Sequence, residues 1–130
     1  MYEVTESSGT SHQWVEKSGQ FLCIRAGLMG YLHIPLDAIM YAESKGRLIK
    51  LYLVDHRYTF YGVLREMEQE LKERRFARVH KSYVVNFDYV RRIHHEKIHM
   101  GNGEILPLSR SKGRFIREEI AQYNCKKQEE

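Results

Sequence analysis

The segment Phe76–Lys112, "FARVHKSYVVNFDYVRRIHHEKIHMGNGEILPLSRSK", combines the apolar runs of a folded core with cations at their ends. Runs such as "YVVNF" are rich in β-branched and aromatic residues, a composition typical of strands. Between "IHM" and "EIL" stand Gly101, Asn102 and Gly103, which tolerate the positive φ of a tight turn, so a β-hairpin is predicted there. Five of the cations lie just outside the apolar runs: Arg78, His80, Lys81, Arg110 and Lys112.

The first half of the chain has the same strand-like character. Turn residues divide it into short runs that read "FLCIR", "YLHIP", "AIMYAE", "RLIKLYLV" and "RYTFY". Strict alternation in the fourth run places Ile49, Leu51 and Leu53 on one side, which we expect to face the core. The fold class is therefore predicted to be mainly β, built from short β-sheets.

Two helices are predicted beside these strands. Residues 62–74 have apolar residues at helical spacing, Leu64, Met67 and Leu71, and balanced charges elsewhere, which indicates an amphipathic helix with a solvated face. A short C-terminal helix is expected to start near Ser109 or Ser111, either of which is a suitable N-cap. Its expected apolar face comprises Phe115, Ile116, Ile120 and Tyr123.

The length of 130 residues fits one domain, which we place at residues 20–125. Residues 1–19 are polar and aperiodic and are expected to form a flexible lead or linker, and residues 126–130 a polar tail. No run approaches ~18 apolar residues and the N-terminus lacks a signal-peptide pattern, so a cytoplasmic protein with no membrane segment is expected. The two cysteines, Cys23 and Cys125, are expected to stay reduced.

The net charge of +4 is unevenly distributed. Residues 78–117 contain nine Lys/Arg and only three acids, an excess of +6 within forty residues. Such a concentrated positive field attracts polyanions and speeds their encounter with the protein. Polyanions are therefore the partners that composition favours, although a basic face that is merely solvated would have the same composition.

Catalytic and metal sites are not predicted. In a continuous strand His95 and His99 would point to the same side about 13 Å apart at ~3.3 Å per residue, too far to bind one ion together with His94. No G-x-S-x-G motif and no phosphate-cradling glycine loop is present, and Cys23 lies inside an apolar run. We therefore expect a protein that is not an enzyme and binds no cofactor or metal.

The cations instead concentrate in three loops, "ESKGRLI", "RVHKSY" and "LSRSKGR". Loops on a rigid β scaffold commonly hold recognition residues, and each of these loops mixes Arg or Lys with Ser, which can donate to phosphate oxygens and reach base edges. The candidate nucleic-acid-binding residues are Lys45, Arg47, His80, Lys81, Ser82, Ser109, Arg110 and Lys112.

At these residues the sequence resembles the LytTR DNA-binding domain, the C-terminal output domain of LytR/AlgR-like bacterial response regulators. The resemblance covers roughly residues 21–123. It rests on "IPLDAIMYAES", "FYGVLREMEQEL", "FARVHKSYVVNFDYVRRI" and "EILPLSRSK", of which the block F-x-R-x-H-K-S-x-x-V-N is the most specific. Within that block Asn86 is predicted to be a turn residue that bonds the backbone of "NFDY".

The resemblance implies an elongated fold of short β-sheets whose loops enter successive major grooves of duplex DNA. It also implies transcription regulation in a two-component system, binding as a homodimer to directly repeated sites, and a receiver domain upstream that this chain does not include. The first recognition loop falls on Lys45 and Arg47, the second on residues 80–82, and the third on Arg110 with Ser109 and Lys112. The first loop is about two residues shorter than in some relatives, which makes Arg47 the weakest correspondence.

Two other binding functions remain open at this point. Nine tyrosines on short sheets could stack on the bases of RNA, although no strand has aromatic and basic residues together on one face. The basic face could alternatively bind an acidic protein. Both are alternatives to duplex DNA as the partner.

Overall fold

A computed structural model describes residues 15–18, 20–25, 30–71 and 75–128. The largest of its three antiparallel sheets has five strands in the order β6-β5-β4-β8-β7. Its strands are β4 (Ile39–Lys45), β5 (Leu48–Leu53), β6 (Arg57–Tyr61), β7 (Phe76–His80) and β8 (Tyr83–Asn86). The predicted fold class, mainly β with short sheets, is confirmed.

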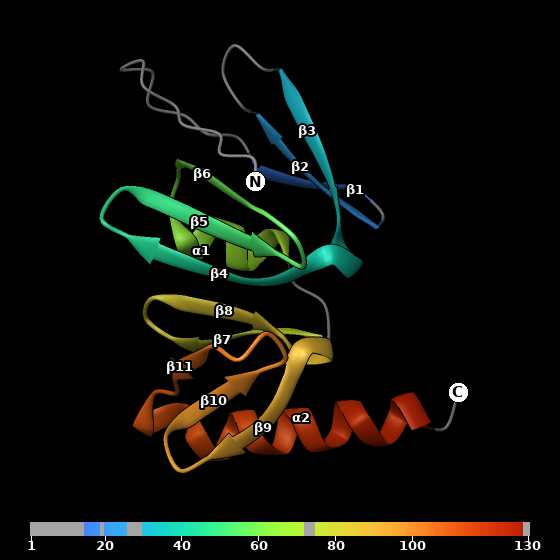
Figure 1. Cartoon of the computed structure of the whole chain (residues 1–130), viewed down its shortest axis with the longest axis vertical. Helices are drawn as coiled ribbons and strands as arrows, with labels where there is room; N and C mark the ends of the chain where they lie inside the picture. Colours follow the sequence, from blue (N-terminus) through green and yellow to red (C-terminus); the bar gives the residue numbers. More distant parts are fainter. Residues whose placement is uncertain (1–14, 19, 26–29, 72–74, 129–130) are drawn as a thin grey trace.

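Two three-stranded sheets and two helices flank this central sheet (Figure 1). The N-terminal sheet comprises β1 (Val15–Ser18), β2 (Phe21–Arg25) and β3 (Tyr31–Pro35), and the C-terminal sheet comprises β9 (Val90–His94), β10 (Lys97–Met100) and β11 (Ile105–Pro107). The helices are α1 (Leu64–Glu70) and α2 (Gly113–Gln128), with short 3-10 turns η2 (Leu36–Ala38), η3 (Phe87–Tyr89) and η4 (Arg110–Lys112).

The central sheet has a hydrophobic core on each face, because its strands alternate apolar residues toward both sides. On one face Ile49, Leu51 and Phe60 pack with residues of α1 and of the N-terminal sheet. On the other face Val85 and Val79 pack with residues of β10, β11 and α2. The sheet is therefore the middle layer of the molecule. The β4–β5 and β7–β8 turns lie at its edge, between the two cores.

Several local predictions are confirmed. Ile49, Leu51 and Leu53 are buried, as the alternation in β5 predicts. The pairing of β10 with β11 confirms the hairpin around 101–103, where Gly103 has φ of +93°. The apolar positions predicted for the first helix are also buried: Leu64, Met67 and Leu71.

The predicted first helix is too long. α1 begins at Leu64 instead of 62, because Gly62 donates its N–H to the Arg47 carbonyl oxygen, 3.0 Å away, and Val63 has an extended backbone. Its regular turns end at Glu70, and residues 72–74 lie outside the described part.

The predicted ends of the domain also differ from the structure. Residues 15–18, placed in a flexible lead, form β1 and pair with β2, because a strand edge offers backbone partners even to a polar segment. α2 continues to Gln128, so it is longer than the short helix that was predicted and includes residues 126–128 of the expected polar tail. Residues 1–14 lie outside the described part.

The predicted start of the C-terminal helix is confirmed, but two details of that prediction differ from the structure. Ser109 is the N-cap residue of η4, which leads directly into α2, but its side chain makes no capping hydrogen bond and its hydroxyl lies 3.0 Å from the Ser111 hydroxyl. Phe115 is 59% exposed and does not belong to the buried face, which Ile116 anchors with Ile120 and Tyr123 packed against it. At 3.6 residues per turn Phe115 lies about 100° around the helix axis from Ile116, outside the buried face.

Cys23 and Cys125 form no disulfide with each other. Within the described ranges, no helix has both the length and the apolar character needed to cross a membrane.

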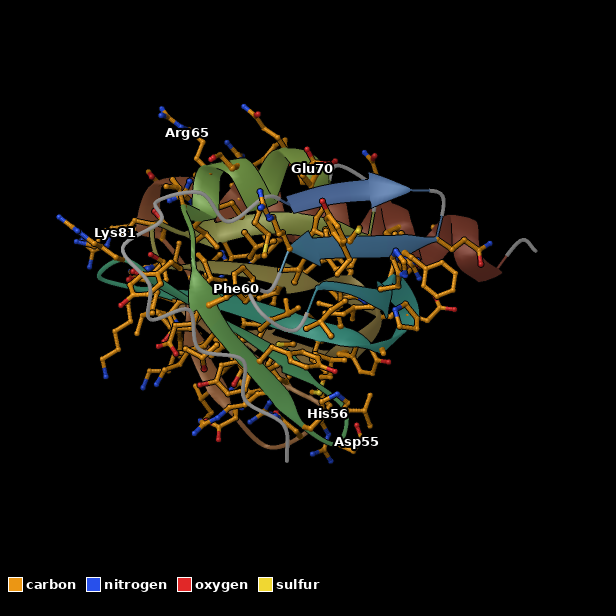
Figure 2. All side chains as sticks on the ribbon, turned by 90° about the horizontal axis from the view of Figure 1, so that it is seen from above. Asp55, His56, Phe60, Arg65, Glu70 and Lys81 are labelled. Carbon is orange, nitrogen blue, oxygen red and sulfur yellow. The ribbon has the colours of Figure 1, made fainter. Side chains whose placement is uncertain are left out.

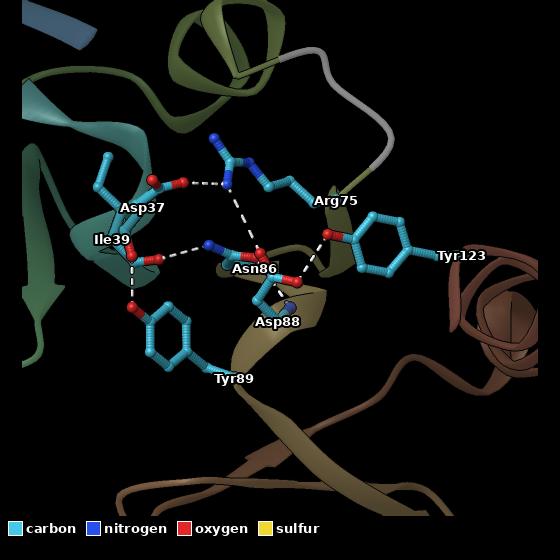
Figure 3. Close-up of polar contacts among 7 residues, drawn as sticks. All are labelled: Asp37, Ile39, Arg75, Asn86, Asp88, Tyr89 and Tyr123. Carbon is cyan, nitrogen blue, oxygen red and sulfur yellow. Dashed lines mark hydrogen bonds and ion pairs between the residues drawn. The ribbon is translucent and has the colours of Figure 1, made fainter. Parts of the chain in front are cut away.

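Asn86 joins the two halves of the central sheet (Figure 3). It is fully buried, its side-chain amide donates to the Ile39 carbonyl oxygen at 2.8 Å, and its side-chain oxygen accepts from the Asp88 N–H at 2.9 Å. The predicted turn role is confirmed, with an additional bond across to β4. Because both partners lose their bond if the side chain is removed, Asn86 is a structural residue rather than a recognition residue.

Arg75 and two tyrosines extend this junction (Figure 3). The Arg75 guanidinium lies 2.5 Å from the Asp37 carboxylate and 3.5 Å from that of Asp88. Tyr89 donates to the Asp37 carbonyl oxygen, and Tyr123 of α2 donates to the Asp88 carboxylate at 2.6 Å. The network therefore ties η2, η3 and α2 together.

We expect Asn86→Ala to destabilise the fold by about 1 to 3 kcal/mol, because it leaves the buried Ile39 carbonyl oxygen and the Asp88 N–H without this partner. Asn102→Ala is the matched control, since Asn102 is exposed and bonds only the Glu104 N–H of its own turn in the described structure. Urea denaturation of both variants measures the difference. Equal loss of stability in the two variants would contradict the role assigned to Asn86.

Candidate functional site

The three basic loops lie on one edge of the molecule, where the β4–β5 turn, the β7–β8 turn and the start of α2 follow one another on the left of Figure 1. We call residues 45–47, 80–82 and 109–112 the loop edge. The Ser44 N–H donates to the Ser82 carbonyl oxygen at 2.9 Å, which connects the first loop to the second. The structure thus brings all eight predicted residues to the same edge.

The third loop is also attached to the second. The Ser109 N–H donates to the Val79 carbonyl oxygen at 2.7 Å, and the Lys112 ammonium lies 3.5 Å from the Arg78 carbonyl oxygen. Backbone hydrogen bonds therefore hold the three loops in a chain, while the side chains of Lys45, Arg47, Lys81, Arg110 and Lys112 remain exposed.

The first loop is a two-residue hairpin turn. Lys45 pairs with Leu48, so Gly46 and Arg47 are its central residues. Gly46 has φ of +63°, which a residue without a Cβ adopts at little cost and which suits the first position of a type II′ turn. The turn therefore presents Lys45 and Arg47 outward on a short, stiff loop.

Arg78 shapes the second loop from behind. Its guanidinium donates to the Lys81 carbonyl oxygen at 2.6 Å and to the Glu68 carboxylate of α1 at 3.2 Å. Both bonds are made within the protein, so Arg78 stabilises the conformation of the second loop. Lys81 extends from the same loop into solvent (Figure 2).

His80 and Ser82 are half-buried rather than fully exposed. The His80 Nδ1 lies 3.1 Å from the Ser82 N–H and accepts its hydrogen bond. A neutral imidazole that accepts at Nδ1 has its proton on Nε2, so Nε2 is the ring atom left to donate. The histidine is thus held by the backbone of its own loop.

Two charged residues next to the loop edge, Arg65 and Glu96, are not among the site residues predicted from the sequence; Glu96 contacts Arg110. Arg65 lies in the first turn of α1, whose balanced charges argued against it, yet it extends on the same side as Lys81 in Figure 2. The bond between the Gly62 N–H and the Arg47 carbonyl oxygen places the start of α1 next to the first loop. The sequence did contain one indication that Arg65 could be a site residue, because it follows closely after the end of the predicted strand "RYTFY", as the other loop cations follow theirs.

The histidine cluster does not have the geometry expected for a continuous strand. His95 is a turn residue between β9 and β10 with φ of 57°, and its ring lies 4.1 Å from that of His94, centroid to centroid. The nearby positive charge of His95 lowers the pKa of His94. Within the described ranges, no three His, Cys, Asp or Glu residues are grouped so that they could hold a metal ion.

A group of tyrosines lies behind the loops. The Glu43 carboxylate accepts from the Tyr83 hydroxyl at 2.8 Å and from the Tyr52 hydroxyl at 3.3 Å, and Tyr52 stacks on buried Tyr41. Burial, with the bond to Glu43, raises the pKa of Tyr83 to about 12. These rings are engaged inside the protein, which disfavours them as a platform for stacking RNA bases.

Comparison with known proteins identifies the family. The family model of the LytTr DNA-binding domain matches residues 30–121, most of the chain. A solved LytTr DNA-binding domain from Bacillus cereus, from a protein described as a methyl-accepting/DNA response regulator, is 26% identical with a TM-score of 0.62, over 86% of this chain and 98% of that one. The sensory transduction protein LytT of Bacillus subtilis is 32% identical over 78 residues, 56% of this chain.

The aligned segment spans only 32% of that relative's length. The family match itself covers β3 to β11, α1, η4 and the start of α2, and so includes all three basic loops. On that evidence the chain belongs to the LytTr DNA-binding domain family.

Proposed function

We propose that this chain is the sequence-specific output domain of a response-regulator-like transcription factor, and that its loop edge enters the major groove of duplex DNA. The observation that carries the proposal is the set of three exposed basic loops linked by backbone hydrogen bonds on one edge. Pre-ordered loops lose little conformational freedom on binding, so more of the contact energy appears as affinity.

The proposed roles follow from side-chain chemistry. Arg110 and Arg47 have planar guanidinium groups that can bind guanine O6 and N7 with two hydrogen bonds, so they are proposed to read bases. Lys45, Lys81 and Lys112 have compact ammonium groups and are proposed to hold phosphates. The His80 ring and the Ser82 and Ser109 hydroxyls supply further hydrogen-bond donors on the loop edge.

The wider setting is proposed from the family. We infer cytoplasmic transcription regulation, a homodimer on directly repeated sites, and control by a receiver domain outside this chain. The sequence and the family both support a binding module without catalytic activity or cofactor.

We expect binding to duplex DNA to weaken steeply with salt. If about four to six phosphates are neutralised, log K against log salt should have a slope of about −4 to −5. Fluorescence polarisation with a duplex selected from a random library measures this slope. Single-stranded RNA and an acidic polypeptide serve as competitors, and stronger binding of either one than of the selected duplex would reject the proposal, as would a flat salt response.

We expect Arg110→Ala to cost about 1 to 3 kcal/mol on the selected duplex and to relax preference at one base pair, with little change in salt slope. Lys112→Ala should weaken binding to selected and random duplexes alike and lower the slope by about one. Titration of both variants against single-base substitutions of the site distinguishes a residue that contacts bases from one that contacts phosphates. Arg110 is a phosphate contact if its removal weakens all sequences equally.

Arg47→Ala should behave like Arg110→Ala at a different base pair, since both guanidinium groups are exposed on the same edge. The same titration checks this expectation. A uniform loss of affinity over all sequences would show that the short first loop contacts only the backbone.

A further inference from the structure

Arg110 does not stand alone on the loop edge. Its Nε lies 3.2 Å from the Glu96 carboxylate, which comes from the β9–β10 turn fourteen residues earlier. The two side chains are 87% and 55% exposed, so the pair lies at the surface where a ligand could reach it. The family motifs quoted above do not include this acid.

The backbone of the β9–β10 turn is attached to the third loop independently of this pair. The Leu108 N–H donates to the Glu96 carbonyl oxygen at 2.9 Å, and the Arg117 guanidinium of α2 donates to the His95 carbonyl oxygen. His95 also has the left-handed φ of 57°, which turns the chain at this point. These contacts hold the main chain of the turn and so place Glu96 within reach of Arg110.

The atom that Glu96 contacts determines what remains for a ligand. A guanidinium has one donor at Nε and two at each terminal nitrogen, in a planar fork. With Nε bonded to Glu96, the edge formed by the two terminal nitrogens is still available, and that edge can present two parallel donors to guanine O6 and N7. Without the contact, the long Arg110 side chain would sample many rotamers. Restricting it to one of them on binding would then cost conformational entropy.

We propose that Glu96 is a positioning residue that orients Arg110 for base readout, and this rests on the proposed base-reading role of Arg110. The carboxylate has a second, opposite effect, because a negative charge near the duplex repels phosphates. Orientation acts on the choice of base, whereas repulsion acts on all sequences, so the two effects can be measured separately.

The experiment uses three variants of the full chain: Glu96→Gln, Glu96→Ala and Glu96→Ala combined with Arg110→Ala. Gln keeps an oxygen that can accept from Nε but has no charge, whereas Ala removes both. Each is titrated against the selected duplex, against the single substitution at the base pair that Arg110→Ala relaxes, and against random duplex. Glu118→Ala, an exposed acid of α2, is the matched control for loss of charge.

Both Glu96 variants should bind random duplex a few-fold more tightly at low salt, because the repulsion is gone. Discrimination at the Arg110 base pair should fall about threefold to fivefold in Glu96→Ala, within the range that an exposed ion pair can supply. Glu96→Gln should retain most of that discrimination, and Glu118→Ala all of it. In the Arg110→Ala background, Glu96→Ala should change discrimination no further.

The outcomes distinguish failure of the base-reading role of Arg110 from failure of the positioning role of Glu96. If Arg110→Ala leaves discrimination intact at every base pair, the base-reading role and the positioning role both fail. If Arg110→Ala relaxes one base pair but Glu96→Ala does not, only the positioning role fails. Equal loss in Glu96→Gln and Glu96→Ala, or increased discrimination in either, would also overturn it, since Glu96 would then act through charge alone or block Arg110. Because the Glu96 backbone makes the bond to Leu108, these variants keep that fold contact.

Discussion

The pairing of β4 with β8 is the interaction on which the rest of the structure depends. It joins the β4–β5–β6 meander to the β7–β8 hairpin through Tyr41↔Val85, Ala42↔Val84 and Glu43↔Tyr83. Because successive residues face opposite sides, Ala42 and Val84 point into one core, while Tyr41 and Val85 point into the other. The same pairing aligns the first two basic loops, since the bond from Ser44 to Ser82 extends it by one step.

The cations of residues 75–82 differ in what they contact. Arg78 and Arg75 are bonded inside the protein, to the Lys81 carbonyl oxygen and to acids of other elements, and they shape the scaffold. Lys81, by contrast, is exposed at the tip of its turn. A basic segment thus supplies both the frame and the candidate contacts, and charge alone does not separate the two groups.

Residues whose environment is set by local pattern were predicted well. Ile49 and Leu51 alternate along a strand, Met67 repeats at helical spacing, and Asn86 suits a turn, so each followed from its near neighbours. The errors concern Phe115, β1 and the ion pair of Arg110 with Glu96. Phe115 lies at the margin of the apolar stripe of α2, outside the face that Ile116 anchors, and β1 exists because a strand edge was available to it.

The sequence by itself determined the mainly β class, the positions of the three basic loops, and the family, because alternation, turn residues and the block around His80 are all local signals. Only the tertiary structure decided which cations face solvent and that an acid accompanies Arg110. The physical reason is that strand order is set by packing two cores and by hydrogen bonds between distant residues, such as Ser109 to Val79. Residues such as Glu96 and Arg110, which come into contact only through the tertiary fold, form no periodic pattern in the sequence that would predict the contact.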